Sequence, residues 1–395
     1  MPPGSPGSVL CRHFGACGGC STQDVPYDQQ LLRKAAIVTR LVRAVLPDAP
    51  EARPMLAASE PWGYRQKAHF VFESGAMGHY ARSSRRLVPV VECPVHDPRA
   101  NELAFKFQHA FRRLDDPSLK GIVVRSALGT DEIGATLIFA REPGKRLRAA
   151  TRTVLEKGAV LTSLHINIHP KDDGFLFGQE TRKITGAERV RERVAGASFL
   201  ISPTSFFQTN IAAAEVLVKL VLEAAGDPTS QIPDPGSRRV LDLYAGAGLF
   251  AIPLAKAGHR VTAVEESRAA VADGEANLRL NRIPPERCRF IASAVERALS
   301  QSPIKDQRSP IETVVLDPPR EGLSAAVIEA VFGGLRPSKA IYVSCEPDAL
   351  ARDLGQIAAL GYSIDSLQPV DMFPHTPHIE TIACLSPARS SRAGA

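Results

Sequence analysis

The chain lacks several features that would assign it to whole classes of protein. Among its 395 residues no apolar run approaches the roughly 20 residues that a membrane-spanning helix needs. Residues 1–8 are rich in Pro, Gly and Ser and contain no apolar segment of the kind found in signal peptides. The cysteines number seven, and an odd count argues against a disulfide framework. These absences predict a cytoplasmic protein without a membrane partner, and we expect a monomer.

The charge of the chain is unevenly distributed. Residues 1–198 contain 29 Lys and Arg against 20 Asp and Glu, whereas the remainder contains 19 against 22. A basic half suits a polyanionic partner such as nucleic acid, with Arg65, Lys67, Arg82, Arg85 and Arg86 as candidate phosphate contacts. A solvated arginine-rich surface would give the same count, so charge alone leaves both interpretations open.

The apolar pattern divides the chain into three regions. Residues 1–62 combine a cysteine-rich loop with a helix predicted at 24–46. Residues 63–198 contain short β-like runs between turn residues, which predicts an α+β domain of mostly antiparallel strands. Residues 199–395 alternate strands and helices, which is typical of a doubly wound, Rossmann-like α/β sheet. Its strands are predicted at 239–243, 260–264, 289–292, 313–316, 340–343 and 379–385.

A glycine-rich loop follows the first strand of the α/β region. Residues 243–248 read Leu-Tyr-Ala-Gly-Ala-Gly, and glycines at this place let a ligand approach the backbone. The next strand ends in Glu265, which can accept hydrogen bonds from two ribose hydroxyls. The dinucleotide fingerprint is incomplete, because Phe250 and Ala251 follow the second glycine. The pattern therefore favours an adenosine ligand without a pyrophosphate, S-adenosylmethionine (SAM), over a plain tight turn.

A second motif, Asp317-Pro318-Pro319-Arg320, closes a later strand. The two prolines make a rigid turn that places Asp317 at the carboxyl edge of the sheet, where ligands bind in such folds. A related motif with an aromatic fourth residue marks enzymes that methylate amino groups. Arg320 stands in that place here, which disfavours amino methylation but leaves it as an alternative.

Two reactive side chains lie near the C-terminus. Cys345 follows the strand at 340–343, and the N-terminus of a following helix would lower the pKa of its thiol and favour the reactive thiolate. Most cysteines are buried core residues, and we assign that role to Cys288 and Cys384. Glu380 ends the segment His-Thr-Pro-His-Ile-Glu at 375–380 and is a candidate base, with a salt-bridged strand residue as the alternative.

Four cysteines form a possible metal site. Cys11, Cys17 and Cys20 give the spacing C-x5-C-G-G-C, and Cys93 follows far along the chain. Four thiolates can bind Zn²⁺ or an iron–sulfur cluster, and this spacing matches neither a twin C-x2-C zinc ribbon nor the C-x3-C-x2-C of radical-SAM enzymes. A bound metal or cluster is favoured over free thiols.

These motifs together resemble the RNA uracil-C5 methyltransferases over nearly the whole chain. Residues 63–67 (Gly-Tyr-Arg-Gln-Lys) and 205–210 (Ser-Phe-Phe-Gln-Thr-Asn) are similar to two of the family's segments. The resemblance implies a class I SAM-dependent methyltransferase fold in which Cys345 attacks carbon 6 of uracil and Glu380 removes the carbon-5 proton. It also implies a set of SAM-binding residues, namely Gln208, Tyr244, Gly246, Gly248, Glu265 and Asp317.

The resemblance extends to the cysteine set and to the RNA target. Cys11, Cys17, Cys20 and Cys93 are similar to the [4Fe-4S] ligands of the members that act on ribosomal RNA, and the tRNA enzyme typically lacks them. Some members begin with a small β-barrel domain that we expect to be absent here. This combination implies 23S rRNA as substrate, with tRNA as the alternative. A non-catalytic iron–sulfur RNA-binding protein is a further alternative.

Overall fold

The structure is a computed structural model that describes most of residues 10–388. The ranges outside the description are 1–9, 58–59, 112–115, 145–149, 152–153, 155–160, 174–175, 227–238, 301–303, 305–309 and 389–395. The prediction made for residues 1–8 therefore lies outside the described residues. Within the described ranges, no helix has the length and apolar character needed to cross a membrane.

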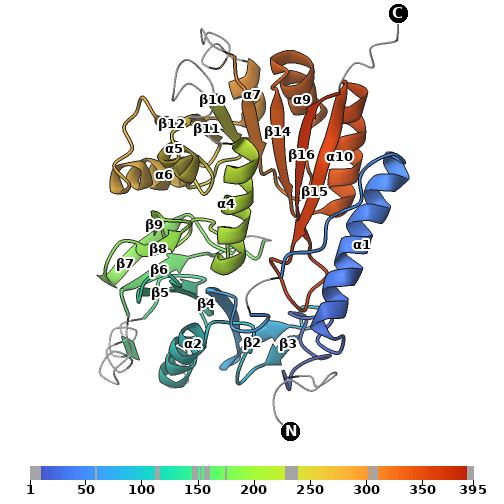
Figure 1. Ribbon diagram of the computed structural model, residues 1–395. Helices are drawn as coiled ribbons and strands as arrows, with labels where there is room; N and C mark the ends of the chain where they lie inside the picture. Colours follow the sequence, from blue (N-terminus) through green and yellow to red (C-terminus); the bar gives the residue numbers. More distant parts are fainter. Residues whose placement is uncertain are drawn as a thin grey trace, which may run out of the picture.

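The C-terminal half forms a seven-stranded mixed sheet in the order β12-β11-β10-β13-β14-β16-β15 (Figure 1). The first five of these strands run parallel, whereas β16 is antiparallel to both of its neighbours. All six predicted strands are confirmed within one or two residues, and β15 is an additional strand. The bounds are β10 Arg239–Leu243, β11 Arg260–Glu265, β12 Cys288–Ala292, β13 Thr313–Leu316, β14 Lys339–Ser344, β15 Tyr362–Val370 and β16 Glu380–Pro387.

Helices cover both faces of this sheet because its strands are apolar on both sides. In β14, Ile341 packs into one core and Tyr342 into the other, as the two-residue period of a strand requires. One face carries α4 (Ile211–Ala225), α5 (Ala251–Lys256) and α6 (Arg268–Leu280). The other carries α1 (Tyr27–Val45), α7 (Val295–Ser300), α9 (Ala325–Ile328), the π-helix η1 (Glu329–Leu335) and α10 (Pro347–Ala359).

The central region forms a second seven-stranded sheet in the order β3-β2-β1-β4-β5-β6-β7. The predicted antiparallel pairing holds for every neighbouring pair except β5 and β6, which run parallel. Helix α2 (Pro98–Phe111) covers one face and contributes Leu103, Phe107 and Phe111 to the core. The bounds are β1 Lys67–Glu73, β2 Ala76–Tyr80, β3 Leu87–Pro89, β4 Leu119–Ser126, β5 Ile133–Phe139, β6 Ser163–Ile168 and β7 Glu180–Gly186.

A two-stranded ribbon lies between the sheets (Figure 1) and consists of β8 (Val190–Val194) and β9 (Ala197–Ile201). Gln66 connects the central region to the start of α4 through two hydrogen bonds. Its backbone N–H donates to the Thr209 carbonyl (2.7 Å), and its side-chain oxygen accepts from the Ile211 N–H (3.0 Å). The segment at 63–67 is therefore fixed against the residues just after Gln208.

Candidate active site

The predicted functional residues gather at one edge of the C-terminal sheet. The glycine loop follows the end of β10, and Glu265 is the last residue of β11. Asp317 follows β13, and Cys345 follows β14. Glu380 is the first residue of β16, and because that strand is antiparallel it begins at the same edge. Residues far apart in the sequence thus share one ligand-binding edge.

Cys345, Glu380 and Asp317 are close enough for their charges to interact. Glu380 is only 3% exposed, and burial together with the charge of Asp317 raises the pKa of its carboxyl well above the ordinary value. Burial also raises the pKa of Asp317, to about 7. A raised pKa makes a carboxylate a stronger proton acceptor. The site therefore holds two acids and one thiol of the kind that proton transfer at carbon needs.

The expectation of a lowered thiol pKa at Cys345 is wrong for this structure. Its pKa is raised to about 11, first because the thiol is partly buried and then because Glu380 and Asp317 place negative charge beside it. Pro347 does begin α10 two residues later, but the helix N-terminus is outweighed. The guanidinium of Arg320 acts in the opposite direction and lowers the pKa of both Cys345 and Glu380.

Replacing Arg320 should therefore make the thiolate harder to form. Thiolate is scarce near neutral pH and rises about tenfold per pH unit up to the thiol pKa, so alkylation of Cys345 by iodoacetamide should accelerate with pH. In Arg320→Gln the alkylation midpoint should move to higher pH, because the cation that favours the thiolate is gone. The measurement is alkylation rate against pH, followed by peptide mass spectrometry. An unchanged or lower midpoint would show that Arg320 does not act on the thiol.

The glycine loop has the backbone conformation of a ligand cradle. Gly246 and Gly248 have φ values of 55° and 94°, in the region that disfavours side chains. A Cβ on Gly248 would lie 3.0 Å from Ile252 and Phe290, whereas a Cβ on Gly246 would meet nothing within 4 Å. Open space thus lies over Gly246. Its N–H donates to Glu265 (3.0 Å), which fixes the carboxylate at the mouth of that space.

Gln208 and Tyr244 are two further residues that are predicted to bind SAM. Gln208 is 8% exposed and lies just before α4, beside Phe206, whose ring is 71% exposed. Tyr244 has a positive φ of 63°. Its ring packs on the core next to α10, where burial and the charges of Glu296 and Asp353 raise its pKa to about 12. The backbone of Tyr244 thus shapes the loop, while its ring packs against the core.

Asp242 is a candidate that the motifs did not single out. It lies in β10 and is fully buried, and its carboxylate oxygens have no hydrogen bond of good geometry within the described ranges; the backbone N–H of Ala251 is the one donor close enough to lower its pKa. Burial and the charge of Asp317 raise its pKa well above the ordinary range. An unpaired buried carboxylate destabilises the folded protein. We therefore expect a ligand that hydrogen-bonds to Asp242. A charged residue inside the apolar run at 239–243 was the available signal.

We expect Asp242→Asn to weaken SAM binding and to change the pH dependence of stability. Because the folded pKa is raised, the folded state holds a proton that the unfolded chain releases, and wild-type stability falls as pH rises above about 4. The variant has no such proton to lose, so the difference in unfolding midpoint between variant and wild type should shift in favour of the variant as pH rises above about 4. Calorimetry with SAM and thermal unfolding at several pH values measure both effects. Parallel pH profiles would contradict the assignment.

Buried contacts with α1 and Trp62 hold the segment at 371–380 in place. His375 is 3% exposed, has φ 65°, stacks on Trp62 with ring centroids 4.0 Å apart, and bonds through its N–H to Gln30 (3.0 Å). Lys34 reaches from α1 to pair with Asp371 at 2.7 Å, with both side chains buried. These contacts fix the turn that leads into Glu380. His375 is therefore a packing residue, while His378 remains partly exposed.

The four cysteines of the predicted metal site line one cavity. The cavity has a volume of about 220 Å³ and is lined by Cys11, Cys17, Cys20 and Cys93, with Arg65 in its wall. Burial raises the pKa of Cys17, Cys20 and Cys93, and the thiols act on one another electrostatically. A metal binds cysteines as thiolates, so metal binding here would release the thiol protons. The donor set fits a four-thiolate cluster, and Arg65 suits its negative charge.

An open glycine loop at a sheet edge, an acidic strand end beside it and reactive side chains opposite define a SAM-dependent methyltransferase of class I. The sequence profile of the tRNA (uracil-5-)-methyltransferase family matches residues 26–387. The chain therefore belongs to that family, whose members are SAM-dependent enzymes that methylate RNA.

Individual relatives agree with this assignment. The chain is 34% identical to an uncharacterized RNA methyltransferase of Thermosynechococcus vestitus, over 98% of this chain and 86% of that protein. A relative from Gloeobacter violaceus is also 34% identical, over 95% of this chain and 82% of its own length. The crystal structure of Pyrococcus abyssi tRNA (uracil-54, C5)-methyltransferase with S-adenosyl-L-homocysteine is similar at TM-score 0.73 and 25% identity, covering 94% and 86% of the two chains.

Proposed function

We propose that this enzyme forms 5-methyluridine in 23S rRNA, with Cys345 as nucleophile and Glu380 as base. The observation that carries the proposal is the meeting of Cys345, Glu380 and Asp317 at the edge that also holds the glycine loop. SAM would be held by Gln208, Tyr244, Gly246, Gly248, Glu265 and Asp317, with Asp242 beneath them. We further propose that the enzyme acts as a monomer in the cytoplasm.

The chemistry follows from the poor nucleophilicity of carbon 5 in uracil. The Cys345 thiolate adds to carbon 6, and the displaced electron pair forms an enolate with negative charge at carbon 5. SAM supplies the methyl group that carbon 5 receives. The Glu380 carboxylate then takes the carbon-5 proton, and the electrons of that C–H bond restore the double bond and expel the thiolate. Cys345 ends as it began, and Glu380 carries the released proton.

The face of the central sheet opposite α2 offers the RNA contacts. Lys67 and Arg125 are directly paired across β1 and β4. Arg125 is 8% exposed and is close enough to Glu192 for their charges to interact. Burial and the neighbouring Arg125 charge lower the pKa of Lys67 to about 8. Adjacent like charges destabilise a sheet, and although Glu192 offsets part of the Arg125 charge, no described anion acts on Lys67. We propose that residues 63–198 form the RNA-binding domain and that this pair meets a phosphate, with Phe206 stacking on a base.

Salt dependence tests this RNA contact. Arg125→Gln should weaken RNA binding most at low ionic strength and reduce the slope of log affinity against log salt by about 1. Arg289→Gln, at an exposed position on the far strand β12, is the matched control and should leave the slope unchanged. Affinities measured at several salt concentrations decide the matter. Equal slopes for wild type and Arg125→Gln would show that Arg125 does not contact a phosphate of the RNA.

We also propose that the four-cysteine cavity holds a [4Fe-4S] cluster that organises residues 1–62 beside the RNA-binding domain. The cavity joins the N-terminal loop to Cys93, and Ser21, next to Cys20, donates its N–H to the His375 carbonyl (2.8 Å). Protein purified without oxygen should show visible iron–sulfur absorption, with iron and acid-labile sulfide in equal amounts. Zinc as the sole metal under these conditions would contradict the cluster.

The RNA target is tested in cells. The cluster cysteines favour 23S rRNA, whereas the similarity to a tRNA (uracil-54, C5)-methyltransferase favours tRNA as the second candidate. Mass-spectrometric mapping of 5-methyluridine in rRNA and tRNA from a deletion strain separates the two. We expect loss of the modification at a 23S rRNA site, restored by the wild-type gene and not by Cys345→Ala. Loss confined to tRNA would replace the rRNA assignment.

A further inference from the structure

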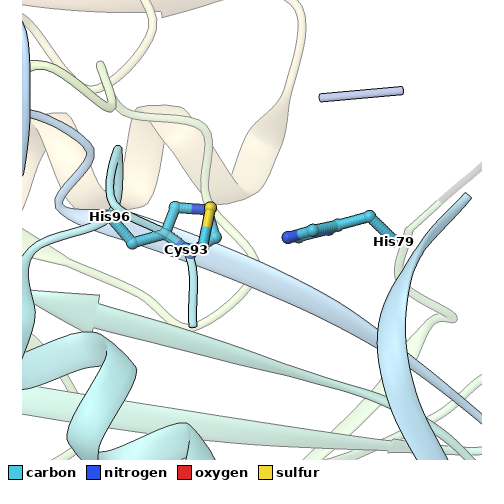
Figure 2. A group of neighbouring side chains, drawn as sticks. All are labelled: His79, Cys93 and His96. Carbon is cyan, nitrogen blue, oxygen red and sulfur yellow. The ribbon is translucent and has the colours of Figure 1, made fainter. Parts of the chain in front are cut away.

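Two histidines stand in the wall of the cysteine cavity, outside the four-thiolate set. His79 comes from β2, and His96 lies three residues after Cys93. One ring nitrogen of each histidine and the Sγ of Cys93 lie within 4.8 Å of one another. Figure 2 shows the His79 ring directed toward Cys93 and His96. These three side chains therefore form a compact donor group of two nitrogens and one sulfur.

Each ring has a buried nitrogen without a hydrogen bond of good geometry. Nε2 of His79 and Nδ1 of His96 meet no such partner within the described ranges, and the side chain of Asn101 beside His96 is the one hydrogen-bonding neighbour that acts to raise the pKa of His96. His96 is only 3% exposed. Phe70 holds both rings in place, stacked on His79 with centroids 4.9 Å apart and edge-on to His96 at 5.1 Å. An unpaired buried nitrogen is costly, and a metal ion would satisfy both atoms at once.

We propose that His79, Cys93 and His96 bind a Zn²⁺ ion when no cluster occupies the cavity. Zinc takes imidazole nitrogens at about 2.0–2.1 Å and thiolate sulfur at about 2.3 Å in tetrahedral geometry, so its ligand atoms lie about 3.5 Å apart. The three donors need to move together by about 1 Å to meet this geometry. The fourth position faces the cavity. Binding releases the thiol proton of Cys93, and no oxidation is involved.

Cys93 prevents the zinc ion and the iron–sulfur cluster from being bound at the same time. It belongs both to the four-thiolate set and to this histidine set, so a cluster and a zinc ion compete for one sulfur. The positive charge of Arg65 lies in the same cavity. It repels a zinc dication and attracts an anionic cluster, so it favours binding of the cluster. The cluster is thus favoured when iron and sulfide are present, and zinc occupies the cavity of the apoprotein.

The experiment uses the full chain stripped of metal under anaerobic, reducing conditions. Zn²⁺ is titrated in competition with a chromophoric chelator, and X-ray absorption of the zinc-loaded protein counts nitrogen and sulfur neighbours. We expect one zinc with at least two nitrogen neighbours, and a loss of affinity of about 10²-fold or more in His79→Phe/His96→Leu, which keeps the packing apolar. A shell of four sulfurs, or an unchanged affinity in the double variant, overturns the proposal.

A matched variant separates this inference from the proposed cluster. Cys11→Ser removes a thiolate of the four-cysteine set and none of the three zinc donors, so it should lose the iron–sulfur cluster and keep the zinc affinity. The histidine double variant should do the reverse and take up iron and sulfide normally. Circular dichroism checks that both variants fold. If the wild type takes up no cluster, the cluster proposal fails while the zinc titration still decides this one.

Discussion

Cys345→Ala is expected to reduce methylation of RNA by at least about 10⁴-fold while leaving SAM affinity within a few-fold of the wild type. Cys345 follows β14 at the sheet edge that holds the glycine loop, and a thiolate is a stronger nucleophile than a hydroxyl. Carbon 5 of uracil is a poor nucleophile until a group adds to carbon 6. Single-turnover transfer of a labelled methyl group measures the loss. Calorimetry with SAM shows that the site remains formed.

A matched cysteine controls for nonspecific effects. Cys384 lies in β16, is partly buried and packs against the core, so Cys384→Ala should retain the wild-type rate at a small cost in stability. A Cys345→Ala protein that still methylates uridine at a measurable fraction of the wild-type rate would show that the reaction does not need a covalent bond to Cys345. It would revive amino methylation through the Asp317 turn as the alternative.

Glu380→Gln is expected to slow product formation by about 10²–10⁴-fold and to accumulate an enzyme–RNA adduct. The amide keeps the shape of the buried side chain but accepts no proton, so the methylated intermediate stays attached to Cys345. The adduct should appear as a slowly migrating band on a denaturing gel, and it should contain both RNA and the transferred methyl group. Burial and the charge of Asp317 raise the pKa of Glu380, so its deprotonated form is a stronger proton acceptor than an ordinary carboxylate.

The control for this variant is Glu329→Gln, at an exposed position on the π-helix. It should turn over normally and show no adduct. Turnover of Glu380→Gln at the wild-type rate would transfer the base role to another group. Asp317, whose charge interacts with both Glu380 and Cys345, is the nearest carboxylate to test next.

The sequence predicted the C-terminal sheet well because a strand buried on both faces leaves a plain apolar signal. The runs at 313–316 and 340–343 each became a strand within a residue or two. Strand β15 was missed because its first half is polar, with Ser363 and Asp365 exposed and Ser366 partly buried. The parallel pairing of β5 with β6 was also missed, since strand direction depends on the connection and not on local pattern.

Tertiary packing decided what the local pattern left open. Helix α1 was placed with the N-terminal loop, yet it packs on α10 and the C-terminal sheet, with Val38 and Val42 fully buried there. An amphipathic pattern shows that a helix has an apolar face, but not which surface covers it. The functional consequence is large, because Lys34 on this helix anchors the turn that leads to Glu380.

The site residues were recognised by motif, whereas their electrostatics needed the structure. The proposed roles of Cys345 and Glu380 came from the resemblance of their motifs to the family, but the sign of the thiol pKa shift depends on two carboxylates that only the fold brings near. The orphaned oxygens of Asp242 depend on burial in the same way. His79 and His96 carried no spacing signal, because a strand and a turn bring them beside Cys93.

The most direct test of the central claim is trapping with RNA that contains 5-fluorouridine at the target position. Fluorine at carbon 5 leaves no proton for Glu380 to remove, so the reaction should stop at a stable adduct. We predict a SAM-dependent covalent complex, with the RNA fragment and a methyl group attached to the peptide that contains Cys345. Absence of any adduct, or attachment to another residue, would contradict the account.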